Sequence, residues 1–129
     1  MKLNHFQNDY MTLNIQQGIV HVSYKKNIII DLRAAETIVK DRLQFQDHLS
    51  YPILCDISDV NYADHSAIQY LADNGSLLAK AVALLSNDAR HYSMGNYFVQ
   101  VHEPYIPTKI FRDKEEALLF LHQFKKEYL

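Results

Sequence analysis

Two short apolar runs constrain the fold more than any other feature of this sequence. The first occupies residues 52–57 and is broken only by Asp56, and the second occupies residues 81–85 and is wholly apolar. Each run is too short for a helix and too continuous for a strand with one face in water, so each predicts a strand covered on both sides. Between them, Asp64 is a good N-cap for an amphipathic helix. The order strand, helix, strand predicts a parallel, right-handed crossover unit.

The chain begins with a predicted hairpin. Residues 10–16 and 19–24 both alternate between apolar and polar side chains, and Gln17 and Gly18 supply a turn between them. The alternation predicts one buried face on each strand. The residues before this hairpin, 1–8, are expected to be flexible.

Capping residues mark the helices of the remaining chain. Asp31 and Asp113 stand where N-caps are expected, and Glu116 completes a capping box with Asp113. Gly95, inside an expected helix, predicts a close approach to another backbone. Besides the helix after Asp64, apolar periodicity predicts helices at about 32–48, 87–102 and 114–124, and brief strands at 28–30 and 108–111.

These elements predict one α/β domain that spans residues 1–129. An N-terminal β-hairpin is followed by βα units, which form a mixed, largely parallel sheet with about four helices. A chain of this length is long enough to bury one hydrophobic core. No internal repeat, low-complexity segment or linker divides it.

Composition argues against several kinds of partner and cofactor. The formal net charge is −2, with 13 Lys and Arg residues scattered among 15 Asp and Glu residues, so no nucleic acid partner is expected. The three glycines, at 18, 75 and 95, do not form the glycine cluster that a P-loop or a dinucleotide fingerprint requires, so no nucleotide cofactor is expected. The chain shows neither a signal peptide nor a run of about 18 apolar residues. A soluble, cytoplasmic protein is therefore expected.

Reactive side chains are present, but not in catalytic or metal-binding patterns. Cys55, the single cysteine, lies within the first apolar run and is predicted to be a small core residue. No two of the seven histidines are three or four residues apart, so no metal cofactor is expected. Asp64, His65 and Ser66 are the residue types of a hydrolase triad, but neighbours at a helix start cannot adopt its geometry. A non-enzymatic protein is expected.

Residues 53–68, ILCDISDVNYADHSAI, resemble the signature of STAS domains, the SpoIIAA-like group of anti-sigma-factor antagonists. In that family an apolar strand ends in Asp-Leu-Ser, and Asp-Ser-Ser-Gly-Leu then opens a helix. Here Asp56, Ile57 and Ser58 match the first motif, and residues 64–68 match the second. The segments GIVHVSYKK, AVALL, GNYFV and PTKIFRDKEEALLFL further resemble a functionally uncharacterised bacterial branch of this group, over about residues 18–124.

The resemblance implies a regulatory protein-interaction module with an unidentified protein partner. In the antagonist family, a partner kinase phosphorylates the first serine of the second motif, and the added charge breaks the complex. This chain has His65 at that position, with Ser66 next to it and Ala67 in place of the usual glycine. The candidate phosphoswitch residues are therefore Ser66, His65 and Ser58.

Residues 92–106 contain more apolar and aromatic side chains than one helix face can bury. One interpretation is a contact surface, most simply that of a homodimer. The alternative is a pocket for a small apolar ligand or lipid, in a module that contacts membranes peripherally. The candidate residues for either role are Tyr92, Tyr97, Phe98, Tyr105 and Ile106.

Overall fold

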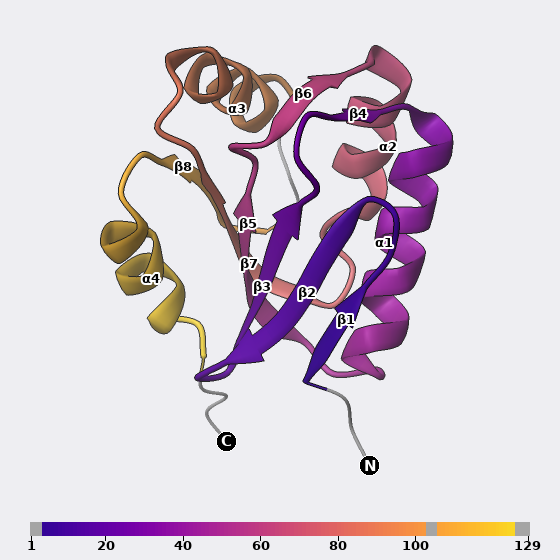
Figure 1. Cartoon of the computed structure of the whole chain (residues 1–129). Helices are drawn as coiled ribbons and strands as arrows, with labels where there is room; N and C mark the ends of the chain where they lie inside the picture. The colour runs from indigo at the N-terminus through magenta and orange to yellow at the C-terminus, as the bar shows by residue number, and fades with distance from the viewer. Residues whose placement is uncertain (1–3, 103–105, 126–129) are drawn as a thin grey trace.

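A six-stranded mixed sheet forms the centre of the molecule in this computed structural model, which describes residues 4–102 and 106–125 (Figure 1). In order across the sheet, the strands are β1 (His5–Gln7), β2 (Met11–Gln16), β3 (Ile19–Tyr24), β5 (Tyr51–Asp56), β7 (Ala79–Leu85) and β8 (Thr108–Phe111). The predicted hairpin is the antiparallel pair β2 and β3, and β1 adds to its outer edge. From β3 to β8 all neighbours are parallel, so the first apolar run is the central strand β5.

Within the described residues, four helices cover the two faces of this sheet unequally. They are α1 (Leu32–Gln46), α2 (His65–Asn74), α3 (Ala89–His102) and α4 (Lys114–His122). α1 and α2 lie on one face together with α3, which packs along β8, whereas α4 alone covers the other face (Figure 1). The predicted α/β class, with a mixed, largely parallel sheet and about four helices, is confirmed.

Side chains of the central strand alternate between two separate apolar clusters. Ile53 and Cys55 of β5 belong to the cluster under α1 and α2, whereas Leu54 between them belongs to the cluster under α4. Ile53 and Leu54 are each 3% exposed. Burial on both faces explains why the run is continuously apolar.

The predicted N-caps begin three of the helices. The carboxylates of Asp31, Asp64 and Asp113 each accept a hydrogen bond from the backbone amide three residues later, at 2.8, 2.8 and 3.2 Å. Each bond satisfies an amide that the helix start leaves without a partner. α1 ends earlier than expected because Asp47 adopts a left-handed conformation with φ of 51°.

A second, two-stranded parallel sheet was not predicted from the sequence. It pairs β4 (Ile28–Ile30) with β6 (Val60–Ala63), where the sequence indicated an extended segment and a polar turn. Val60 is 4% exposed, so one side of this ribbon packs into the domain. The amide of Asp64 donates to the carbonyl of Ile30 at 3.1 Å and joins the ribbon to the start of α2. The short strand β1 was not predicted either.

Gly95 lies where α3 approaches β8. A Cβ atom at this position would lie 2.7 Å from Cδ1 of Ile110. The predicted close approach is confirmed, but the neighbour is a side chain of the sheet rather than another backbone. A larger residue would therefore push against the β8 side of the domain.

Candidate functional site

The three candidate phosphoswitch residues are all exposed near the carboxyl end of β5. Ser58 lies in the turn after this strand, where its amide donates to Oδ1 of Asp56 at 3.0 Å. His65 and Ser66 are the first two residues of α2 and follow the Asp64 cap. A modifying enzyme therefore has access to the Ser66 hydroxyl. A phosphate there would lie at a favourable helix N-terminus but close to the Asp64 carboxylate.

An exposed apolar pair lies next to these residues on the β4–β6 ribbon. Ile29 and Tyr62 are partners in the register of the ribbon and are 59% and 60% exposed. We call this pair the ribbon patch. The sequence did not reveal it, because residues 58–64 were interpreted as a polar turn. Exposed apolar side chains of this kind are what a protein partner buries.

The second candidate surface, residues 92–106, is only partly described. The guanidinium of Arg112 lies 4.4 Å from the centre of the Tyr92 ring, a cation–π contact between the loop after β8 and α3. Ile106 packs against the larger apolar cluster, and Thr108 Oγ1 donates to its carbonyl at 2.9 Å. The rest of the predicted surface lies outside the described residues, namely the side chains of Tyr97 and Phe98, and Tyr105.

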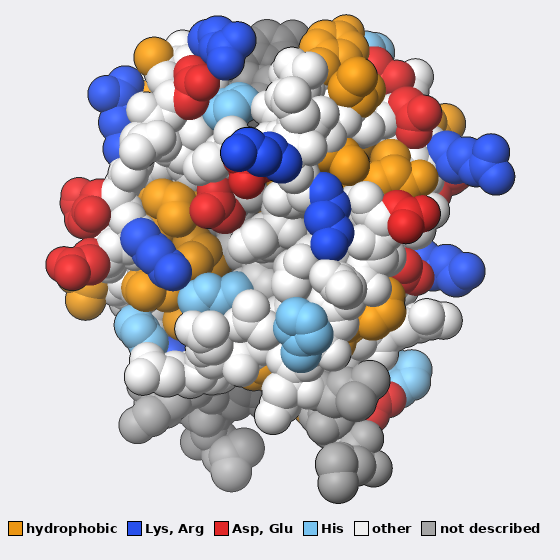
Figure 2. All heavy atoms as spheres, in the orientation of Figure 1, with side chains coloured by type: hydrophobic (Ala, Val, Ile, Leu, Met, Phe, Trp, Pro, Cys, Tyr) orange, Lys and Arg blue, Asp and Glu red, His pale blue; other side chains and the backbone are white. Residues whose placement is uncertain are grey.

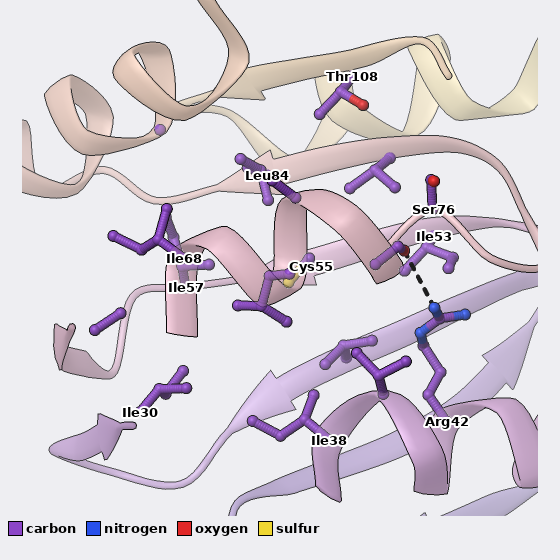
Figure 3. Close-up of a pocket in the computed structure, with 18 of the residues that line it drawn as sticks. Ile30, Ile38, Arg42, Ile53, Cys55, Ile57, Ile68, Ser76, Leu84 and Thr108 are labelled. Atoms are coloured by element: carbon purple, nitrogen blue, oxygen red, sulfur yellow. Dashed lines mark hydrogen bonds between the residues drawn. The ribbon is translucent and has the colours of Figure 1, made fainter. Parts of the chain in front are cut away.

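A cavity of about 170 Å³ lies between the sheet and the three helices on its larger side (Figure 3). Its walls are almost wholly apolar and come from β3, β5, β7, α1, α2 and Gly95 of α3, and it opens partly to solvent.

The cavity has an apolar end and a polar end. Figure 3 shows Ile30 and Ile57 toward one side, beneath the β4–β6 ribbon, and Arg42 and Ser76 toward the other. The sheet wall between the two ends includes Cys55. A molecule with one polar group and an apolar body matches this distribution.

Arg42 is only 5% exposed and has no acidic partner among the described residues. Its Nη1 donates to Oε1 of Gln46, and its Nη2 donates to the carbonyls of Gly75 and Leu77 at 3.1 and 3.0 Å. These carbonyls follow the end of α2, where the helix dipole favours a cation. Burial lowers the pKa of Arg42, as expected for a charge that leaves water without a carboxylate partner.

Arg42 was not predicted from the sequence, although a signal was present. The apolar stripe of α1 runs through Ala35, Ile38 and Val39, and position 42 continues it at the spacing of three and four residues. A long cationic side chain in such a stripe must either reach water or find partners inside the domain. The structure shows the second outcome.

Tyr24 and Cys55 form a neutral polar pair in the sheet wall of the cavity. The Cys55 thiol donates to the Tyr24 hydroxyl oxygen at 3.6 Å. Burial raises the pKa of Cys55 to about 11 and raises the pKa of Tyr24 well above its usual value. The Cys55 thiol thus stays protonated near neutral pH, as predicted for a core residue.

Ser86 and His91 form a buried pair outside the cavity. Nε2 of His91 donates to the Val60 carbonyl at 2.6 Å, so its Nδ1 accepts from the Ser86 hydroxyl at 3.1 Å. A serine bonded to a histidine resembles part of a nucleophilic site. However, the two residues are 1% and 6% exposed, which leaves no room for a substrate. The pair links β7, α3 and β6.

The remaining surface offers few features that would recruit other partners. On the face shown in Figure 2, basic and acidic side chains are interspersed and form no basic stripe. In residues 4–102 and 106–125, no group of three or more His, Cys, Asp or Glu side chains could hold a metal ion. No helix in that part of the chain is long and apolar enough to cross a bilayer.

Comparison with solved structures identifies the fold. The crystal structure of an uncharacterised DUF3478-family protein with a SpoIIAA-like fold, from Shewanella loihica PV-4, matches with a TM-score of 0.63 and 15% identity, over 86% of this chain and 91% of that one. The murine Solute Carrier 26 family member A9 anion transporter matches with a TM-score of 0.56 and 18% identity, over 82% of this chain and 18% of the transporter. The fold is SpoIIAA-like, as the resemblance to STAS domains implied.

Comparison of sequences places the chain in a family whose function is not known. No curated protein shows a significant match. A family model described as a domain of unknown function, DUF7793, matches residues 13–125. This range contains the ribbon patch, the phosphoswitch candidates and the whole described lining of the cavity. The chain therefore belongs to the DUF7793 family.

Proposed function

We propose that this chain is a non-enzymatic protein-interaction module of the STAS type that acts in regulation in the cytoplasm. The observation that carries this proposal is the ribbon patch, where Ile29 and Tyr62 are exposed close to the start of α2. A partner that buries Tyr62 gains a large, rigid contact at a low cost in side-chain entropy. A phosphate on Ser66 would bring charge to the rim of that contact and weaken it. His65 and Ser58, which are also exposed, are the other candidate residues of this phosphoswitch.

The test is quantitative capture of partners from the cells that produce the chain, with tagged wild-type, Tyr62→Ser and Leu119→Ser proteins. Leu119 is the matched control because it is 68% exposed on α4, away from the ribbon. A specific partner should be retained by the wild type and by Leu119→Ser, and should fall at least tenfold with Tyr62→Ser. Ser66→Asp should reproduce that loss. Equal capture by all the proteins would contradict the proposal.

Self-association through residues 92–106 belongs to the same proposal. The support is the half-buried Tyr92 ring, whose contact with Arg112 holds it in place at the surface of α3. Light scattering should report a homodimer for the wild type and a folded monomer for Tyr92→Ala. A wild-type monomer at high micromolar concentration would contradict this part of the proposal and leave the ribbon patch untouched.

A second candidate function, binding of a small apolar molecule, is favoured by the cavity. Gly95 and Ile106, from the segment that was expected to cover a pocket, both line it. Apolar cavities of roughly 150 Å³ are known to hold molecules the size of benzene. Native mass spectrometry of protein purified from its own cells should then show a retained small molecule. Binding to liposomes that does not depend on salt would instead support a membrane-peripheral module.

A further inference from the structure

We infer that the cavity binds a small apolar carboxylic acid whose carboxylate is held by Arg42. This inference deepens the second candidate function and rests on it, because it names the chemical class of the ligand and the residue that recognises its charge.

The guanidinium of Arg42 has bonding capacity that the protein does not use. Arginine carries five N–H groups, and three of them donate to Gln46, Gly75 and Leu77. The N–H on Nε and one N–H on Nη1 have no acceptor among the described residues. A buried cation whose partners are all neutral is costly. A ligand carboxylate would supply the missing charge and accept the two remaining N–H groups.

The acceptors of a carboxylate match the unused donors of Arg42. A carboxylate has two oxygens that accept several bonds, so it can take both remaining N–H groups, whereas a ligand that mainly donates hydrogen bonds cannot. Tyr24 and Cys55 pair with each other at 3.6 Å on the sheet wall of the cavity.

The size of the cavity limits the apolar part of the ligand. A volume of about 170 Å³ slightly exceeds the roughly 150 Å³ that accommodates benzene. One ring or a short aliphatic chain, attached to a carboxylate, fits within this volume, whereas the tail of a long-chain acid would extend through the open side of the cavity. Phenylacetate and hexanoate are therefore suitable probes, and phenylacetamide is the neutral control of nearly the same shape.

Isoleucine methyl groups inside and outside the cavity can report where a ligand binds. Ile38, Ile53 and Ile68 line the cavity, whereas Ile19 lies under α4 and Ile29 is exposed on the ribbon. In an NMR titration of isoleucine methyl groups, phenylacetate should shift the first three signals and leave the other two unchanged. Shifts at Ile19 or Ile29 alone, or no shifts at all, would overturn both the inference and the second candidate function.

Charge recognition is tested with Arg42→Met, which keeps an unbranched apolar side chain but lacks the guanidinium, and with Arg33→Met, a control on the exposed start of α1. The wild type and Arg33→Met should bind phenylacetate at least tenfold more tightly than phenylacetamide. Arg42→Met should lose this preference and still bind the amide. Equal affinity of the wild type for acid and amide would overturn the inference but leave apolar binding intact. That wild-type comparison decides the question even if Arg42→Met does not fold.

Discussion

The same sheet is closed in two different ways on its two faces. Under α4, the side chains of Ala83, Ala117 and Leu121 are all 0% exposed, so a single helix lies directly on small residues. The rings of Phe120 and Phe124 lie 5.3 Å apart and complete that side. On the other face, three helices surround a cavity of about 170 Å³. Both faces are apolar, so hydrophobic content does not explain the difference; the α4 face is filled by side chains, whereas the three-helix face leaves a cavity.

The largest expected effect comes from substituting one leucine on each face of the sheet, which compares how tightly the two faces are packed. Leu121→Ala should lower the free energy of unfolding by about 3 kcal/mol, because it leaves a cavity in a filled region. Leu71 of α2 is partly exposed and borders the cavity, so Leu71→Ala should cost only about 1–2 kcal/mol. Urea denaturation measures both values. Equal losses would show that the two faces are packed alike.

Arg42→Met tests whether Arg42 also stabilises the three-helix side of the domain. The substitution removes the donors of the Gly75 and Leu77 carbonyls, so we expect a loss of about 2 kcal/mol. The exposed Arg33→Met control should stay within about 0.5 kcal/mol of the wild type. A variant as stable as the wild type would mean that Arg42 contributes nothing to stability and is retained for another purpose.

The pH dependence of stability with and without Cys55 tests whether the cavity wall excludes water. Because burial raises its pKa from 9.0 to about 11, the folded protein holds the thiol proton more strongly than the unfolded chain. The resulting stabilisation is fully present below about pH 9 and is lost as the pH rises toward 11, which amounts to about 1 kcal/mol between pH 8 and pH 10. Urea titrations at both pH values should show a smaller loss for Cys55→Ala. The same loss in both proteins would indicate a solvated thiol.

The sequence predicted the elements whose signals are local. Strand β5 has an uninterrupted apolar run, and Asp31, Asp64 and Asp113 identify helix starts without any knowledge of tertiary contacts. By contrast, the sequence predicted β4 as a brief strand but not its partner β6, because residues 60–63 lie in a segment that was interpreted as a polar turn. Their pairing, and the ribbon patch that it creates, depend on contacts between segments far apart in the chain.

The candidate sites were predictable to different extents for the same reason. The position of Ser66 just after the Asp64 cap followed from the motif, and exposure at a helix start is usual. The cavity follows from distances between α1, α2 and the sheet, which no one-dimensional pattern records. Only Arg42, a charged residue within the stripe of Ile38 and Val39, gave a sequence signal of this site.

The smallest expected effect compares neighbouring residues of β7 that point to opposite faces. Leu84 lines the cavity and Ala83 packs under α4. Leu84→Phe fills existing space and should raise the free energy of unfolding by up to about 1 kcal/mol, while weakening phenylacetate binding. Ala83→Val adds atoms to a filled region and should lower the free energy of unfolding by about 1 kcal/mol. Changes of opposite sign in the free energy of unfolding at these adjacent positions would establish that the three-helix face has unfilled space and the α4 face does not. Destabilisation by both would mean that side chains already occupy the cavity.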